Sequence, residues 1–147
     1  MNLSPHFTLA EMTVSQEAAR SGLRNDPDLR QIEALTALCQ NVLEPLRARV
    51  KRPIVVTSGY RSISINRRIG GTNRSQHCRG EAADIIVPNI APEDLFDLIR
   101  AMKLPFDQVI DEFGQWVHVS HSLAGPQRGN ALMAYRAGGN VQYRKIA

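Results

Sequence analysis

The sequence contains few cysteines, few histidines and few aromatic residues, and it has no long apolar run. Two cysteines cannot build a disulfide framework, and the apolar stretches are shorter than the roughly 20 residues of a transmembrane helix. The first residues, MNLSPHFTLAEM, lack a basic segment followed by an apolar one, so we expect no secretory signal. These absences predict a protein that is made in the cytoplasm and that does not bind a membrane.

The chain is long enough for one domain with a substantial core. Its 147 residues are 43% apolar and 22% charged, which is ordinary for a globular protein. No internal repeat or linker is visible, so we expect a single domain over residues 1–147. The net charge of +4 and the pI of about 9.5 favour anionic partners, such as nucleic acid or a cell-wall polymer, without choosing between them.

Helical patterns dominate the first 50 residues. An Asn-Asp-Pro sequence at residues 25–27 is typical of a helix start, and apolar residues then recur at helical spacing to about residue 50. Pro45 predicts a kink or an earlier end of this helix. Residues 3–22 predict one or two short helical turns, the first with a capping-box pattern at Thr8 and Glu11.

The rest of the chain alternates short strands with short helices. The predicted strands are residues 54–57, 83–87, 108–110, 116–120, 132–136 and 141–144. The predicted helices are residues 63–69 and a segment that starts at residue 92, and residues 113–115 predict a hairpin turn. We therefore predict an α+β fold in which N-terminal helices pack on a small, mostly antiparallel sheet.

A histidine and an aspartate stand close together in the stretch SQHCRGEAAD. His77 precedes Asp84 by seven residues, and a second histidine, His118, lies in a strand-like run downstream. Two imidazoles and one carboxylate from separate segments can hold a catalytic zinc ion and leave one position open for water. We expect residues 72–76 to form a polar loop that delivers His77 to this site.

Two carboxylates near the predicted hairpin turn are candidates for a general base. The register of the hairpin decides between them, because only one of them can stand opposite His118. A three-residue loop at 114–116 would place Glu112 there, and a two-residue loop at 114–115 would place Asp111 there. The sequence pattern leaves both alternatives open.

Three further residues have two interpretations each. Arg61 follows a predicted strand, where its guanidinium can bind a carboxylate or phosphate, but a surface arginine is the simpler interpretation. His121 can stabilise an oxyanion or simply end its strand. Cys78 adjoins His77 and can bind metal, although we favour a small packed residue.

Three segments of the chain resemble a known family. The segments SGYRS, SQHCRGEAADI and WVHVS are similar to those of the peptidase M15 group, which contains zinc D-alanyl-D-alanine carboxypeptidases and phage peptidoglycan endopeptidases. The signature of the group is Ser-x-His-x-x-Gly-x-Ala-x-Asp, matched here by Ser75, His77, Gly80, Ala82 and Asp84. The N-terminal segment resembles the small phage-encoded branch, so the likeness spans nearly the whole chain. The fold of this group is shared with the Hedgehog signalling domain.

The resemblance implies roles for particular residues. It implies that His77, Asp84 and His118 bind zinc and that Arg61 receives the terminal carboxylate of the substrate. It also implies that Ser75 and Gln76 either support the metal ligands or contact the substrate, and we add His121, or a main-chain donor, as an oxyanion-stabilising group.

The position of the catalytic base departs from the common pattern of the group. Many members carry an acid three residues before the last histidine, where this chain has Gln115, which cannot accept a proton usefully. The Hedgehog-like arrangement has a glutamate six residues before that histidine, and Glu112 matches it. We therefore expect Glu112 to act as the base.

The expected function is zinc-dependent cleavage of peptidoglycan stem peptides, by a carboxypeptidase or an endopeptidase. The enzyme would act on the cell wall after release from the cytoplasm or as part of a phage particle. A non-catalytic Hedgehog-like zinc-binding module is the first alternative, because Gln115 stands where an acid is often found. A basic nucleic-acid-binding phage protein is the second, but no aromatic-interleaved basic stretch supports it. The sequence does not indicate the oligomeric state.

Overall fold

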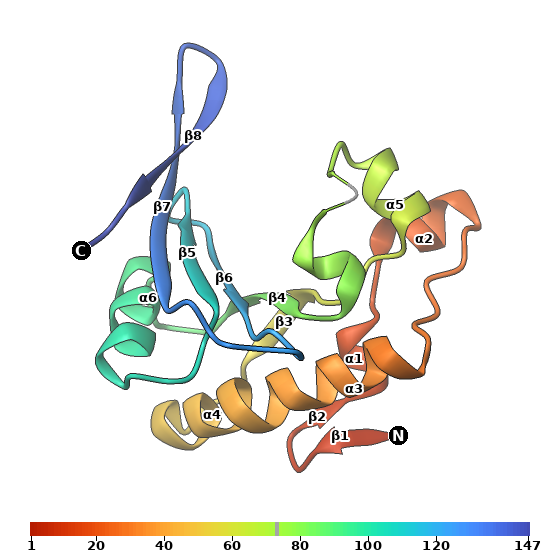
Figure 1. Cartoon of the computed structure of the whole chain (residues 1–147), viewed down its shortest axis with the longest axis horizontal. Helices are drawn as coiled ribbons and strands as arrows, with labels where there is room; N and C mark the ends of the chain where they lie inside the picture. The colour runs from red at the N-terminus through yellow and green to blue at the C-terminus, as the bar shows by residue number, and fades with distance from the viewer. Residues whose placement is uncertain (73) are drawn as a thin grey trace.

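The computed structural model describes residues 1–72 and 74–147, and these have the predicted α+β architecture (Figure 1). The helices are α1 (Leu9–Met12), α2 (Gln16–Ser21), α3 (Leu29–Leu38), α4 (Glu44–Val50), α5 (Ile63–Arg68) and α6 (Pro92–Ala101). A π-helical turn, η1 (Cys39–Leu43), joins α3 to α4, and a 3₁₀ turn, η2 (Gln76–Arg79), precedes the fourth strand. Within the described ranges, no helix is both long enough and apolar enough to cross a bilayer.

Six strands form the main sheet, and two short strands form a separate hairpin at the N-terminus. The strands are β1 (Asn2–Ser4), β2 (Phe7–Thr8), β3 (Val55–Ser58), β4 (Ala82–Ile86), β5 (Gln108–Glu112), β6 (Trp116–Ser120), β7 (Asn130–Ala137) and β8 (Asn140–Lys145). The order in the main sheet is β3-β4-β6-β5-β7-β8. Every neighbouring pair is antiparallel except β5 and β7, so the prediction of a mostly antiparallel sheet is confirmed.

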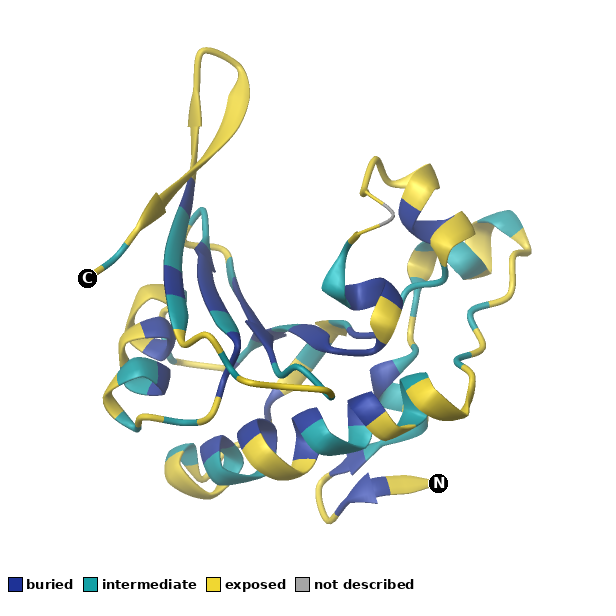
Figure 2. Ribbon diagram, viewed as in Figure 1, coloured by how far each residue is buried: buried dark blue, intermediate teal, exposed yellow. Residues whose placement is uncertain are grey.

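The central strands of the sheet divide their side chains between a core face and a polar face. Side chains alternate along a strand, so residues of one parity share a face. The odd-numbered residues of β4, β5 and β6 enter the hydrophobic core, for example Ala83, Ile85, Val109, Val117 and Val119. Figure 2 shows the resulting contrast between the buried central strands and the exposed tip of the β7–β8 hairpin, which projects beyond the sheet. The even-numbered residues are therefore left for the opposite, polar face.

The long N-terminal helix is continuous but changes its geometry before Pro45. Proline has no amide hydrogen, and its ring collides with the carbonyl group four residues earlier in an α-helix. In the η1 turn the backbone widens, and the Glu44 amide donates to the carbonyl of Cys39, five residues back. The helix then continues to Val50, as predicted, and Pro45 is accommodated by a π-helical turn and does not end the helix early.

The start of this helix differs from the prediction. Asp28, rather than the Asn-Asp-Pro sequence at 25–27, caps α3, and its carboxylate accepts from the Gln31 amide in a capping box. The side chain of Asn25 instead bridges three backbone groups of other segments: its amide donates to the carbonyls of Thr13 and Tyr60, and its oxygen accepts from the amide of Ser62. Asn25 therefore fastens the N-terminal segment to the loop after β3.

The N-terminal segment combines a confirmed element with an unpredicted one. The capping box of Thr8 and Glu11 is present at the start of α1, as the sequence indicated. The β1–β2 hairpin was not predicted, because two strands of three and two residues are too short to show a periodic pattern. The carboxylate of Glu44 holds this hairpin against α4 by accepting from the Ser4 hydroxyl and the His6 amide.

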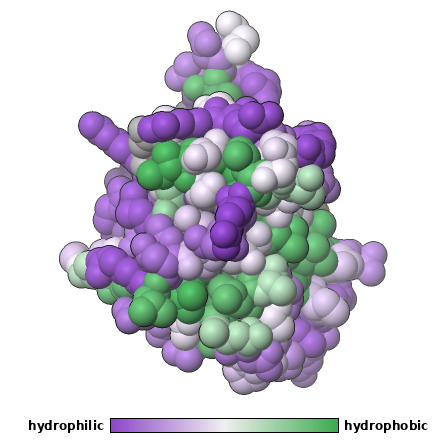
Figure 3. All heavy atoms as spheres, turned by 90° about the vertical axis from the view of Figure 1, so that its right-hand side faces the viewer, coloured by the Kyte–Doolittle hydropathy of each residue, from purple (hydrophilic) through white to green (hydrophobic). Residues whose placement is uncertain are grey.

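The face that bears α2 and α5 exposes several large apolar side chains. Figure 3 shows hydrophobic patches on this side of the molecule, interrupted by hydrophilic side chains. Four exposed apolar residues lie in or next to α2 and α5: Val14, Leu23, Ile63 and Ile69. They are scattered over several elements, which is common on protein surfaces.

Candidate metal centre and its cleft

A polar cleft with a volume of about 640 Å³ opens on the polar face of the sheet. Its lining comes from α5, η2, the loop between them and strands β4, β5, β6 and β8. The predicted loop 72–76 includes residue 73, which lies outside the described residues; Thr72, Arg74, Ser75 and Gln76 all line the cleft. The charged lining residues are Arg61, Arg74, Arg79, Asp84, Glu112 and Arg128, so among the described residues the cleft has more positive than negative side chains.

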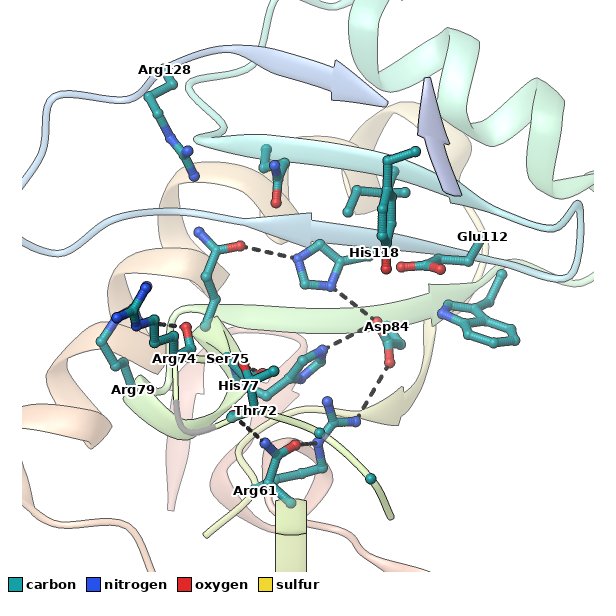
Figure 4. A pocket seen from close by; sticks show the side chains of 18 residues that line it. Arg61, Thr72, Arg74, Ser75, His77, Arg79, Asp84, Glu112, His118 and Arg128 are labelled. Atoms are coloured by element: carbon teal, nitrogen blue, oxygen red, sulfur yellow. Dashed lines mark hydrogen bonds and ion pairs between the residues drawn. The ribbon is translucent and has the colours of Figure 1, made fainter. Parts of the chain in front are cut away.

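His77, Asp84 and His118 converge at the floor of the cleft (Figure 4). The pairing of β4 with β6 places Asp84 directly opposite His118, and the η2 turn before β4 brings His77 to the same carboxylate. The Oδ1 atom of Asp84 lies 3.3 Å from His77 Nε2 and 3.3 Å from His118 Nδ1. Three potential ligand atoms therefore point toward one another, all within 4.8 Å.

The hydrogen bonds of the two imidazoles leave the converging nitrogens free to bind a metal. His77 Nδ1 lies 2.7 Å from the carbonyl oxygen of Gly59, and His118 Nε2 lies 3.2 Å from the side-chain oxygen of Gln76. Both oxygens can only accept, so these nitrogens carry the hydrogens. The opposite nitrogens, which face Asp84, consequently present lone pairs, as in histidines that bind metal through one nitrogen and donate from the other.

The spacing of these atoms fits a tetrahedral ion. Ligands about 2.0 Å from a tetrahedral zinc ion stand about 3.3 Å apart, which is the separation between the Asp84 oxygen and each imidazole nitrogen. Burial alone would raise the pKa of Asp84, but His77 and His118, when protonated in the absence of a metal, hold it well below its usual range through their charge and hydrogen bonds. The carboxylate is therefore ionised and suited to a cation.

The β5–β6 hairpin has a register that neither sequence-based alternative anticipated. Its turn is residues 113–115, as predicted, but Ile110 stands opposite His118 and Glu112 stands opposite Trp116. Both proposed registers, with Glu112 or Asp111 opposite His118, are therefore wrong. The turn uses Phe113 and Gly114 with positive φ angles, a conformation that phenylalanine rarely adopts and that the sequence did not reveal.

The same register nevertheless separates the two candidate carboxylates. Glu112 lies two residues from Ile110 and so shares the face of His118, and it lines the cleft. Asp111 points to the other face, where it is buried and accepts a hydrogen bond from the Gly114 amide. Burial raises the pKa of Glu112; His118 opposes this effect and Asp84 adds to it. Of the two, Glu112 alone is placed to meet a bound substrate.

Arg61 is held rigidly beside the metal ligands. Its Nε donates to the side-chain oxygen of Asn66 at 3.1 Å, and its Nη1 donates to the Ser58 hydroxyl at 3.0 Å and lies 3.9 Å from Asp84 Oδ2. Within residues 1–72 and 74–147, no group accepts a hydrogen bond from Nη2. That amino group is available to a carboxylate in the cleft.

The remaining predicted site residues occupy different environments. Ser75 lines the cleft and its hydroxyl oxygen accepts from the backbone amide of His77. The cleft lining, as far as it is described, does not include His121, which follows the end of β6 and whose backbone amide donates to the Glu81 carbonyl. The Nδ1 atom of His121 is buried and has no hydrogen-bond partner among the described residues. Cys78 is buried outside the group of converging ligand atoms, and burial raises the pKa of its thiol, as suits a packed residue.

Several residues that shape the site had no local signal in the sequence. Gly59 orients His77 through a backbone carbonyl, which no side-chain pattern can show. Asp107, Arg128 and Tyr143 are distant in sequence from the motif and reach the cleft or its border only through the strand order β6-β5-β7-β8.

The fold and the site define an α+β protein in which a His-Asp-His group that could hold a metal ion lies in a cleft beside a carboxylate. A family model described as Peptidase M15 matches residues 5–120. The chain therefore belongs to the peptidase M15 family, whose members are metallopeptidases that usually use zinc. The resemblance noted in the sequence is thus confirmed. A search of curated proteins found no match to this chain.

Proposed function

We propose that this protein is a zinc-dependent metallopeptidase that cleaves the stem peptides of peptidoglycan. The observation that carries the proposal is the meeting of His77, Asp84 and His118 on the same face of the sheet as Glu112, inside one cleft. A peptidase-type function is already supported by membership of the M15 family. The identity of the metal, the substrate and the residue roles are the parts that we propose.

The donor set favours zinc as the metal. Two imidazole nitrogens and one carboxylate oxygen are a known ligand set of catalytic zinc sites, which keep a fourth position open. The metal would polarise the scissile carbonyl group and acidify a water molecule at this position. The protein contributes a fixed arrangement of ligands, since His77 and His118 each donate a hydrogen bond from the ring nitrogen that faces away from Asp84.

Glu112 is our candidate for the general base. It would take a proton from the attacking water and deliver it to the leaving amine. Burial raises the pKa of this carboxyl, which makes the carboxylate a stronger base than an exposed glutamate. Gln115 stands where many relatives have an acid. It lies in the hairpin turn, where its backbone amide donates to the backbone carbonyl of Glu112.

The charges of the cleft suit an anionic peptide. Figure 4 shows Glu112 at one end and Arg74, Arg79 and Arg128 toward the other, with the metal ligands between them. Arg61 would bind the terminal carboxylate of the substrate through its available amino group. The hydroxyl of Ser75 accepts from the His77 backbone amide and retains a hydrogen that it can donate to the substrate.

The substrate implies a place of action outside the cytoplasm. We propose that the protein acts on the cell wall after release from the cytoplasm or as part of a phage particle. A free carboxylate next to the scissile bond would indicate a carboxypeptidase, and cleavage within a cross-linked peptide would indicate an endopeptidase.

The test combines metal analysis with digestion of peptidoglycan. We expect about one zinc ion per chain in the parent protein and in Glu112→Gln, and its loss in His77→Ala. Glu112→Gln should lower turnover by about 100-fold or more, because general base catalysis contributes about 10²–10⁴-fold. The matched control is Asp111→Asn, which alters the adjacent carboxylate on the other face and should retain activity.

Each alternative function has its own outcome in this test. Bound zinc without any released fragment would support the non-catalytic module. Salt-sensitive binding of DNA, together with a zinc content that is indifferent to His77, would support the nucleic-acid alternative. Mass spectrometry of the released fragments would identify the bond that is cleaved.

A further inference from the structure

Gln76 lies between a metal ligand and a buried carboxylate. Its side-chain oxygen is 3.2 Å from His118 Nε2, and its amide nitrogen is 2.9 Å from Asp107 Oδ2. Asp107 is only 4% exposed and is paired with Arg128, whose Nη2 lies 2.7 Å from Oδ2 and whose Nε lies 3.1 Å from Oδ1. An unbroken series of hydrogen bonds therefore runs from Arg128 to His118.

The chemistry of these groups determines which atom donates and which accepts in each hydrogen bond of the series. A carboxylate can only accept hydrogen bonds, so Asp107 requires the amide nitrogen of Gln76. The Gln76 oxygen must then face His118, whose Nε2 has to carry the hydrogen. The lone pair of His118 is thereby placed on Nδ1, the atom that faces Asp84.

Without Asp107, the amide of Gln76 would be free to turn over. Its nitrogen would then donate to His118 Nε2, and the hydrogen of the imidazole would move to Nδ1, where it would block metal binding. Arg128 holds Asp107 in its acceptor role, because its side-chain hydrogen bond keeps the pKa of that carboxyl low. The orientation of the Gln76 amide, and with it the position of the hydrogen on His118, thus depends on Arg128 at the far end of the series.

The series also links the site to the part of the chain beyond the family match. The match ends at residue 120, whereas Arg128 lies in the segment that leads to β7. The Arg128 backbone amide donates to Asp107 Oδ1 at 2.9 Å, and the Asn130 amide donates to the Asp107 carbonyl at 3.0 Å. The C-terminal segment is thereby anchored on the residue that orients Gln76.

We propose that Arg128, Asp107 and Gln76 are positioning residues that fix the tautomer of His118, so that the C-terminal segment sets the affinity of the site for zinc. This inference rests on the proposed metal site but does not depend on the reaction. It can therefore hold for a zinc-binding protein that cleaves nothing, and it can fail for an active peptidase.

The first measurement is zinc affinity, by competition of the full-length protein with a chelator and zinc alone. We expect Gln76→Leu and Asp107→Ala to weaken zinc binding by about 10–100-fold, as is usual when a group that orients a ligand is removed. Asp107→Asn should lose less affinity than Asp107→Ala, because it keeps one oxygen that can accept from Gln76. Arg79→Ala is the matched control: Arg79 also lines the cleft and pairs with a carboxylate, Glu81, at 2.7 Å, but among the described residues no side-chain hydrogen bond of this pair reaches His77, Asp84 or His118.

The second measurement is the hydrogen on His118 Nε2, by nitrogen NMR of the zinc-loaded protein. This hydrogen should exchange slowly with water in the parent, because it is bonded to the Gln76 oxygen, and faster in Asp107→Ala. Zinc affinity within about twofold of the parent for folded Gln76→Leu would overturn the proposal. So would an unchanged exchange rate in Asp107→Ala, or an equal loss of affinity in Arg79→Ala.

A different observation points to a substrate contact in the last strand. The pairing of β6, β5, β7 and β8 places Trp116, Glu112, Ala134 and Tyr143 in one row across the polar face. Ala134 is small, which leaves room beside Glu112 for the side chain of Tyr143, and both Trp116 and Tyr143 line the cleft. Tyr143 is 56% exposed, so its ring offers surface at the rim.

We infer that Trp116 and Tyr143 form two aromatic walls that hold the substrate chain over Glu112. This inference rests on the proposed function, so binding is measured separately from turnover, in the Glu112→Gln background with a purified peptidoglycan fragment. Trp116 is the single tryptophan of the chain, and its fluorescence reports binding directly.

The variants test the wall formed by Tyr143. Tyr143→Ala should weaken binding of the fragment about three- to tenfold, the value of a typical aromatic contact, and leave zinc affinity unchanged. Tyr135→Ala is the control, because Tyr135 is an exposed tyrosine of the same hairpin whose residue parity puts it on the opposite face. Binding unaffected by Tyr143→Ala, or weakened equally by Tyr135→Ala, would refute the inference even if the parent cleaves peptidoglycan.

Discussion

Substitution of Gly59 by alanine should damage both the fold and the metal site. An added Cβ at this position would lie 2.3 Å from the carbonyl oxygen of Met12 and 2.9 Å from its carbonyl carbon. Both contacts are with backbone atoms, so no side chain can rotate away to relieve them. The backbone around Gly59 must therefore move, and it carries the carbonyl oxygen that orients His77 at 2.7 Å.

The size of the effect follows from these contacts. Insertion of a methyl group into a well-packed region costs about 1–3 kcal/mol. The movement also weakens the adjacent bond from the Tyr60 amide to the Met12 carbonyl, worth about 1 kcal/mol. We expect Gly59→Ala to lower the free energy of unfolding by about 2–4 kcal/mol, or Tm by about 4–16 °C for a chain of this length. Loss of the correct His77 orientation should weaken zinc binding by about 10–100-fold.

Thermal unfolding with and without zinc, together with chelator competition, measures both effects. Gly138→Ala is a suitable control, since Gly138 lies in the β7–β8 turn with a φ of 58° and open space around it. This control should cost only about 1–2 kcal/mol for the left-handed backbone and leave zinc affinity unchanged. A Gly59→Ala protein with the Tm and zinc affinity of the parent would contradict the close approach of Gly59 to Met12 and its role in orienting His77.

Three further predictions concern stability. Asn25→Ala should lower the free energy of unfolding, measured in urea, by about 2–3 kcal/mol, because the three hydrogen bonds from the Asn25 side chain to backbone groups are lost. A loss smaller than about 1 kcal/mol would argue that these hydrogen bonds do not hold the two segments together. Zinc at about 100 times its Kd should stabilise the protein by about 2.7 kcal/mol, an effect that chelation removes and that His77→Ala should lack; an equal shift in that variant would place zinc elsewhere. The ion pair with Arg128 lowers the pKa of Asp107, so its stabilisation is complete above the unfolded value of about 3.8 and disappears as the pH falls through the lower folded value. The Tm difference between the parent and Arg128→Ala should accordingly shrink below about pH 4, and a difference independent of pH would exclude the pair as its source.

Local patterns predicted the local features of this protein well. The capping box at Thr8 and Glu11 depends on two residues within one turn, and it is present. The motif residues His77 and Asp84 are close enough in sequence that a turn and a strand suffice to bring them together. The strand containing His118 was also predicted, and only its neighbours in the sheet had to be supplied by the structure.

Features that depend on distant pairing could not be predicted in the same way. The hairpin register rests on Phe113 in the left-handed region, which a phenylalanine does not signal. The β5–β7 pairing is parallel and joins segments about 20 residues apart, so no hairpin pattern indicates it. Asp107 and Arg128 lack any motif, because their importance arises only from where this pairing places them.

The parallel entry of β7 beside β5 has a consequence for how the cleft could open. Strands β4, β5 and β6, with the η2 turn, bring His77, Asp84 and His118 together without any contribution from β7 and β8. Arg128 precedes β7 and Tyr143 lies in β8, so separation of β7 from β5 would remove both residues from the cleft and leave the three converging side chains in place. On the proposals above, such a local opening would loosen the hydrogen bonds behind His118 and remove one wall of the cleft without dismantling the ligand set.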